Sequence, residues 1–170
     1  MSSMSKNKGK TFERECANFL SDLYDDSFTR VPDSGAFTGG KSSFRRQTLT
    51  EGQIRAHKGD IIPPDDWKHF NCECKNYAEF PFHQLFTQSP VPLLEGWIEQ
   101  TLEASDDGDC NVLFLKFNRK GRYLAFQLPT ATFSTIRHLD YSDKNNNIWR
   151  ITGFDDFFSL NKQQFLLRCA

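Results

Sequence analysis

The sequence lacks long hydrophobic runs, a regular cysteine framework and an excess of charge of either sign. No apolar stretch approaches the ~20 residues that a membrane-spanning helix needs, so we expect no membrane association. The start, MSSMSKNKGK, carries lysines but is not followed by an apolar segment, which argues against an export signal. The five cysteines are odd in number and irregularly spaced, and they predict reduced thiols in a cytoplasmic protein.

The length of 170 residues suits one domain with a core of its own, and we expect residues 1–170 to form it. The formal net charge of −1 conceals a segregation of charge along the chain. Five basic residues and one acid lie between residues 34 and 59, and the start of the chain, where we expect residues 1–9 to be flexible, is also basic. The residues predicted to contact an anionic partner such as DNA are Lys8, Lys10, Lys41, Arg45, Arg46 and Lys58.

Hydrophobic periodicity and turn residues predict an alternation of helices and strands. Apolar residues at helical spacing favour a helix over Lys10–Tyr24. The other expected elements are strands at Thr29–Pro32, Asp60–Ile62 and Phe70–Asn76, a helix at Pro92–Ala104, strands at 111–117 and 122–128, a short helix near Ala131–His138, a strand at Asn147–Ile151 and aromatic packing at Phe154–Phe158. We expect a long loop at residues 34–59 and a hairpin connection at residues 63–69. This order predicts an α/β fold with a central mixed sheet flanked by helices.

The stretch KGDIIPPDDWKHFNCECKNY, residues 58–77, concentrates side chains with catalytic potential. Side chains alternate along a strand, so Glu73 and Lys75 share one face while Cys72 and Cys74 share the other. The carboxylate can hold a hard cation, and the ammonium can orient a water or offset charge on a phosphate. If the two strands of this stretch pair, Asp60 reaches the same cation, and two acids suffice for Mg²⁺.

A third acid is available on the first predicted helix. Glu13 lies at the boundary of the apolar stripe and is turned partly inward, whereas Glu15 lies further out and Arg14 faces solvent. On the helix at Pro92–Ala104, Gln100 could face metal-bound water or phosphate, although a surface position is the simpler interpretation.

Other interpretations of these residues stay open. Cys72 and Cys74 could bind Zn²⁺ together with His69 and His83, but the set lacks the paired spacing of zinc ligands, so we favour core packing for both cysteines. The basic stretch could equally be a solvated surface, and a D…ExK spacing also occurs by chance.

Four segments in this order, KGKTFERE, RVPDSGA, KGDI and ECKNY, resemble the PD-(D/E)xK nuclease superfamily. They look most like archaeal-type Holliday junction resolvases and related phage-encoded endonucleases. Three features differ from that pattern: the stretch at 34–59 is longer, Gly59 stands where a proline often precedes the acid, and residues 129–170 extend beyond the shared core.

The resemblance implies a restriction-endonuclease-like core, Mg²⁺ or Mn²⁺ as cofactor, and branched DNA as substrate of a homodimer in the host cytoplasm. It assigns catalysis to Glu13, Asp60, Glu73 and Lys75, metal binding to the three acids and the main-chain carbonyl of Cys74, and DNA contacts to Ser34 and Gly35. Two alternatives remain: a restriction- or recombination-associated nuclease that cuts duplex or single-stranded DNA, and a non-catalytic DNA-binding protein on the same fold.

Overall fold

The computed structural model describes residues 3–32, 58–87, 90–128 and 133–170, with side chains from residue 8 onward. Its elements are α1 (Ser3–Tyr24), β1 (Thr29–Arg30), β2 (Ile61–Ile62), β3 (Phe70–Tyr77), α4 (Gln84–Thr87), α5 (Pro92–Glu103), β4 (Cys110–Phe117), β5 (Gly121–Leu128), β6 (His138–Ser142), β7 (Ile148–Gly153) and α6 (Phe154–Cys169).

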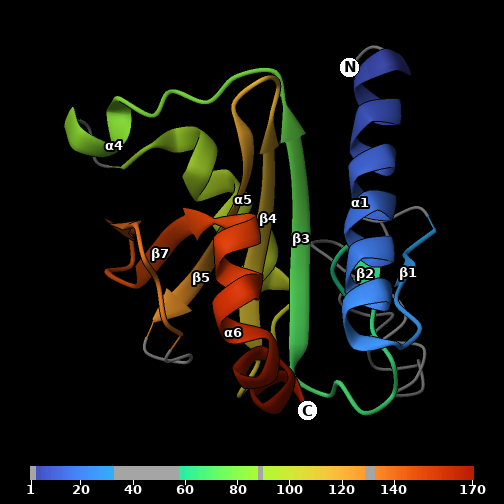
Figure 1. The fold of residues 1–170 in the computed structure, drawn as a ribbon. Coiled ribbons are helices and arrows are strands. Elements are labelled where there is room, and N and C mark those ends of the chain that lie inside the picture. The colour runs from blue at the N-terminus through green and yellow to red at the C-terminus, as the bar shows by residue number, and fades with distance from the viewer. Residues whose placement is uncertain (1–2, 33–57, 88–89, 129–132) are drawn as a thin grey trace.

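A five-stranded mixed sheet forms the centre of the molecule (Figure 1). The strand order is β3-β4-β5-β7-β6, with β3 parallel to β4 and the remaining neighbours antiparallel. Helix α1 lies beside the β3 edge together with the small β1–β2 ribbon, and α5 and α6 pack on opposite faces of the sheet (Figure 1). This mixed α/β arrangement confirms the predicted fold class and is consistent with a restriction-endonuclease-like core.

Two hydrophobic clusters hold the layers together, one on each face of the sheet. Because side chains alternate along a strand, β4 contributes Phe114 to the cluster under α1 and α6, and Leu113 and Leu115 to the cluster under α5. The α1–α6 cluster is rich in phenylalanine, and Phe12 of α1 and Phe165 of α6 are fully buried in it. Both faces of the central strands are therefore covered. β3 is the edge strand of the sheet on the side where α1 lies.

The first helix begins at Ser3 rather than at Lys10, so residues 3–9, which we expected to precede the helix as a flexible segment, form its first turns. Its predicted apolar stripe is confirmed, since Phe12, Cys16 and Leu20 are buried.

The predicted pairing around residues 63–69 is wrong. Strand β2 pairs antiparallel with β1, through Thr29 opposite Ile62 and Arg30 opposite Ile61, whereas β3 belongs to the large sheet. The chain at Gly59–Asp60 nevertheless touches β3, because the amide of Asp60 donates a hydrogen bond of 2.8 Å to the carbonyl of Cys72.

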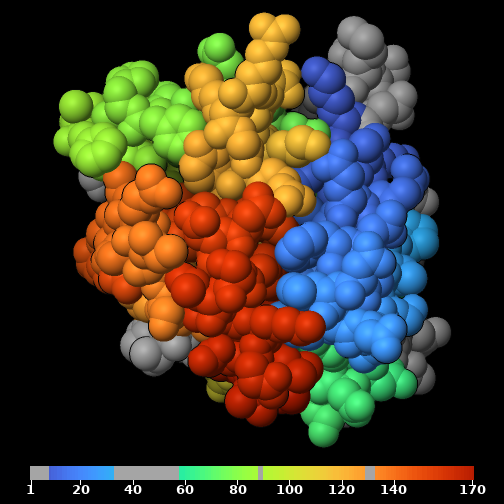
Figure 2. All heavy atoms as spheres, viewed as in Figure 1, coloured from blue at the N-terminus to red at the C-terminus, as the bar shows by residue number. Residues whose placement is uncertain are grey.

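The C-terminal region differs most from expectation. The described residues 133–137 contain no helix, and His138 opens the edge strand β6, so the helix predicted near Ala131–His138 is wrong there. The strand predicted at Asn147–Ile151 is present as β7, at Ile148–Gly153. The aromatic stretch at Phe154–Phe158 is the start of α6, which lies next to α1 on the face shown in Figure 2.

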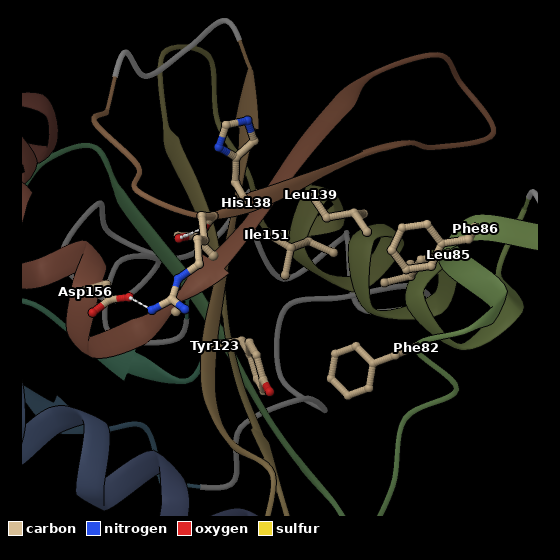
Figure 3. A pocket seen from close by; sticks show the side chains of 11 residues that line it. Phe82, Leu85, Phe86, Tyr123, His138, Leu139, Ile151 and Asp156 are labelled. Atoms are coloured by element: carbon tan, nitrogen blue, oxygen red, sulfur yellow. Dashed lines mark hydrogen bonds and ion pairs between the residues drawn. The ribbon is translucent and has the colours of Figure 1, made fainter.

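An apolar pocket of about 400 Å³ lies between α4 and the strands β5, β6 and β7. Phe82, Phe86, Leu139 and Ile151 are among the side chains that line it (Figure 3). Arg137 and Asp156 also line the pocket, and their side chains lie 4.0 Å apart. The pocket belongs to the β6 side of the sheet, away from the β3 edge. None of the helices in the described part of the chain is long and apolar enough to cross a membrane.

Candidate active site

The backbone at Asp60 is fixed against the edge of β3. Gly59 has a φ of +65°, and a Cβ atom there would collide with the carbonyl oxygen of Cys72, so only glycine allows this close approach. Asp60 then donates its amide to Cys72 and accepts the amide of Val31 at 3.0 Å. The amide of Cys74 donates to Oδ2 of Asp60 at 2.8 Å, which orients the carboxylate along the strand edge.

Glu73 and Lys75 share one face of β3, as the alternation predicts. Lys75 Nζ lies 2.7 Å from Glu73 Oε2 and donates a second hydrogen bond of 2.8 Å to Oε1 of Gln100, on α5. Gln100 of α5 therefore contacts the lysine, and its role toward metal-bound water or phosphate stays a prediction. The buried Glu73 and the partly buried Lys75 and Gln100 thus form one hydrogen-bonded cluster beside Asp60.

Glu13 reaches the same region from α1 and is buried, at 8% exposure. Its Oε2 lies 3.6 Å from Nε of Arg30, on β1, but has no hydrogen-bond partner within the described residues. Glu15 is half-buried and pairs with Lys116 of β4, and Arg14 is exposed, which confirms that Glu13 is the inward-facing acid of this turn.

The carboxylates act on one another electrostatically. Burial, and then the charge of Asp60, raises the pKa of Glu73 to about 7. Burial and Asp60 likewise raise the pKa of Glu13, although Arg30 partly opposes them. Burial disfavours the charged form of Lys75, but Glu73 and Asp60 outweigh it and raise the pKa of the ammonium. Perturbed acids of this kind, clustered around one lysine, are typical of functional sites.

The donor set suits a hard divalent cation held by few protein ligands. Among the described residues no three Asp, Glu, His or Cys side chains form a group that could hold a metal ion. Asp60 and Glu73 are close enough for their carboxyl groups to interact, and Mg²⁺ needs only one or two carboxylates beside waters and phosphate oxygens. The mutual repulsion of these acids and the unpartnered oxygen of Glu13 are features that a cation would relieve.

The cysteine prediction is confirmed. Cys72 and Cys74 are buried in the α1–α6 cluster, and burial raises the pKa of the Cys72 thiol to about 12. A neutral thiol in an apolar core behaves as a small hydrophobic group, not as a metal ligand. His69 and His83 do not join them in a metal-holding group within the described residues.

The predicted DNA-contacting residues fall into three groups. Lys8 and Lys10 are exposed on α1, and the main-chain oxygen of Lys8 accepts a hydrogen bond from Asn76 at the end of β3. Lys58 is buried in ion pairs with Asp106 and Asp109, so its ammonium is not available to a phosphate, and the structure corrects that assignment. The others lie outside the described residues: Ser34, Gly35, Lys41, Arg45 and Arg46.

Two neighbours of the site were not predicted as site residues. Arg30 faces Glu13 from β1, and Asp109 holds Lys58 from the residue before β4. Arg30 lies within the RVPDSGA segment, so its sequence context pointed to it, whereas the pairing of residues 58 and 109 has no local signal.

The comparisons with known proteins place these observations in a family. No curated protein and no solved structure matches the chain. The sequence profile of the family described as "Phage putative PDDEXK endonuclease" matches residues 4–167. This match spans α1, the Asp60 turn, β3 and the C-terminal helix, and therefore nearly the whole chain. The chain belongs to this family of phage PDDEXK endonucleases.

Proposed function

We propose that this protein is a Mg²⁺-dependent DNA endonuclease that hydrolyses phosphodiester bonds in branched DNA. The observation that carries the proposal is the partly buried cluster in which Lys75 lies between Glu73 and Gln100, beside the hydrogen-bonded carboxylate of Asp60. A binding protein has no need for buried acids facing an anionic ligand, because they oppose its approach. Acids and lysine together suit the hydrolysis of a phosphodiester.

The residues have distinct roles in this proposal. Asp60 and Glu73, with the main-chain carbonyl of Cys74, would hold the cation, which would polarise the scissile phosphate and acidify a bound water. Glu13 would act from α1 on the waters around it. Lys75 has three N–H donors, two of which go to Glu73 and Gln100, so the third can hold the attacking water or a phosphate oxygen.

The reaction would be a single displacement at phosphorus. The water oxygen gives up a proton as it forms a bond to phosphorus, the bond between phosphorus and the 3′ oxygen breaks, and the departing 3′ oxygen takes up a proton. The products would be a 5′-phosphate and a 3′-hydroxyl. Gln100 would keep the Lys75 ammonium in place during this step, because it accepts a hydrogen bond but carries no charge that would compete for the phosphate.

Branched DNA is proposed because the four sequence segments resemble junction resolvases in their order. Symmetric cleavage of a junction needs two cuts, so a two-fold dimer is part of the proposal. The phage family supports the host cytoplasm as the place of action. Mn²⁺ should replace Mg²⁺, since both cations accept carboxylate and water ligands.

The test compares cleavage of a labelled four-way junction with cleavage of matched linear duplex, single-stranded and flap substrates, each in Mg²⁺, Mn²⁺ and EDTA. We expect metal-dependent cutting that is fastest on the junction. Equal cutting of linear DNA would replace the junction proposal by a general nuclease, and tight binding without any cutting would favour the non-catalytic alternative.

The basic stretch at residues 34–59 is proposed to contact the DNA backbone. Replacing Arg45 and Arg46 by alanine should weaken DNA binding for all sequences and lower the slope of log affinity against log salt by about one unit per lost phosphate contact. Binding is measured in EDTA at several salt concentrations. An unchanged slope would show that both arginines are only solvated.

A further inference from the structure

The buried lysine next to the site, Lys58, has no place in the chemistry described above. Its side chain is 7% exposed, and its ammonium lies 2.9 Å from Oδ2 of Asp106 and pairs also with Asp109. A buried ion pair is costly to desolvate and often adds little stability, so its presence raises the question of what it holds in place.

Asp109 is a firm anchor for that lysine. Its side chain is buried, and its Oδ2 accepts the amide of Asp106 at 2.6 Å. Arg168 of α6 donates to the carbonyls of Gly108 at 2.9 Å and Asp109 at 3.2 Å. Asp109 directly precedes β4, which pairs with β3 along its whole length. Lys58 is thereby tied to the central sheet.

The next two residues, Gly59 and Asp60, are held in place by their contacts with β3 and Val31. Gly59 passes so close to the Cys72 carbonyl that no side chain fits, and Asp60 is bonded through its amide, its carbonyl and its carboxylate. Lys58 therefore fixes one end of a three-residue segment whose other end presents the Asp60 carboxylate. The ion pair holds the segment to the residue before β4, and the hydrogen bonds hold it to β3 and to Val31, which follows β1.

We propose that Lys58 is a positioning residue for Asp60: its buried pair with Asp109 sets the place at which the Asp60 carboxylate meets the metal. This inference rests on the proposed function, because it presumes a cation at Asp60 and Glu73. Groups that orient metal ligands typically change metal affinity or activity by about 10–100-fold when they are removed.

Metal binding without DNA gives a readout that does not depend on cleavage. The melting temperature is followed as a function of Mn²⁺ concentration for wild type and for Lys58→Met, with Lys68→Met as the matched control. Lys68 is exposed in the connection between β2 and β3. We expect Lys58→Met to need at least about tenfold more Mn²⁺ for the same shift, with a parallel loss of cleavage, and Lys68→Met to behave as wild type.

A double variant separates positioning from stability. Lys58→Met takes the lysine from the buried carboxylate of Asp109, and Asp109→Asn takes the carboxylate charge from the buried lysine, so each change should lower the melting temperature of the metal-free protein. Combining them removes both charges and should restore most of that melting temperature, but not the Mn²⁺ affinity. Lys58→Arg keeps the charge and should retain more affinity than Lys58→Met.

The outcomes are distinguishable. If Mn²⁺ affinity recovers with stability in the double variant, or is unchanged in Lys58→Met, the ion pair is structural and the inference is wrong while the proposed function stands. If Lys58→Met does not fold, the double variant and Lys58→Arg decide in the same way. If wild type shows neither a metal-dependent shift nor metal-dependent cleavage, the proposed function fails and the inference falls with it.

Discussion

The two faces of β3 are chemically opposite, and over residues 72–75 they are buried except for the partly exposed Lys75. On one face Cys72 and Cys74 pack into the phenylalanine-rich cluster below α1 and α6. On the other face Glu73 and Lys75 form an ion pair below α5, at 4% exposure for the glutamate. A hydrophobic pair would fill the second face at lower cost, since burying two charges requires desolvating both. The strand therefore gives up stability on one face only.

That difference separates a face of β3 that serves the core from a face that carries ionisable groups. The cysteine face follows the rule for cores, in which apolar groups face apolar groups. The acidic face is strained in the free protein, because burial and Asp60 raise the pKa of Glu73 to about 7. A cation bound at Asp60 and Glu73, as we propose, would relieve that strain, whereas the cysteine face carries no charge to neutralise.

Removing the ammonium from the acidic face should have the largest effect. Lys75→Met keeps the aliphatic stem but loses the hydrogen bonds to Glu73 and Gln100, and we expect cleavage to fall about 10²–10⁴-fold. The measurement is single-turnover cleavage of the junction in Mg²⁺. Lys116→Met is the matched control, since Lys116 also pairs with a glutamate, but on β4 and outside the site.

Similar losses in Lys75→Met and Lys116→Met would break the distinction between the faces, because the effect would then be a general consequence of removing a lysine from the sheet. Circular dichroism and the melting temperature must show that both variants are folded.

The acidic face should also make the stability of the metal-free protein depend on pH. A buried glutamate with a raised pKa favours the folded state while it is protonated. Its contribution to stability is therefore fully present below the pKa of the unfolded chain, about 4.5, and is lost as the pH rises through the folded pKa of Glu73, about 7. The free energy of unfolding of wild type should fall over this window relative to Glu73→Gln, by roughly 3 kcal/mol at most. Lys75, with its raised pKa, stays charged throughout.

Urea unfolding at pH 4.5, 5.5, 6.5 and 7.5 in EDTA measures this difference. Adding Mg²⁺ should flatten the pH dependence of wild type, because a cation favours the ionised carboxylate. If wild type and Glu73→Gln run parallel across these pH values, the strain assigned to the acidic face is absent.

The cysteine face should respond in stability alone. Changing Cys72 and Cys74 together to alanine should lower the free energy of unfolding by about 1 kcal/mol or more per site and leave metal-dependent cleavage within a few-fold of wild type. Cys169→Ala, another buried thiol, on α6, is the control for the loss of a core cysteine. Stoichiometric zinc in the purified protein that disappears with the double change would overturn the assignment of this face to the core.

Periodicity made much of this comparison predictable. The alternation along β3 separated the two faces, and the stripe of α1 identified Glu13 as the inward acid. The order of helices and strands gave the fold class, because five of the first elements are long, patterned and bounded by turn residues: α1, β3, α5, β4 and β5. Each of these inferences needs only local sequence and the geometry of one element.

What the sequence could not supply depends on contacts between distant residues. In the sequence Lys58 is one of several basic residues that we assigned to DNA binding. Its partner Asp109 stands about fifty residues later, so only the folded chain shows that Lys58 is buried in an ion pair. Strand β2 is two residues long and carries no signal for whether β1 or β3 is its partner. Helix α6 was missed because Asn161 interrupts it with φ −121° and bonds to Ser134, which disturbs the apolar pattern.

Asp60→Asn tests the central claim most directly. The variant keeps a carbonyl oxygen to accept the Cys74 amide, so the fold should persist, while the lost charge should remove metal binding at this position. Asp66→Asn, an exposed acid in the next connection, is the control. The measurement pairs junction cleavage in Mg²⁺ with junction affinity in EDTA: we expect cleavage to be lost and affinity to be kept or increased. Near-normal cleavage by folded Asp60→Asn would contradict the account.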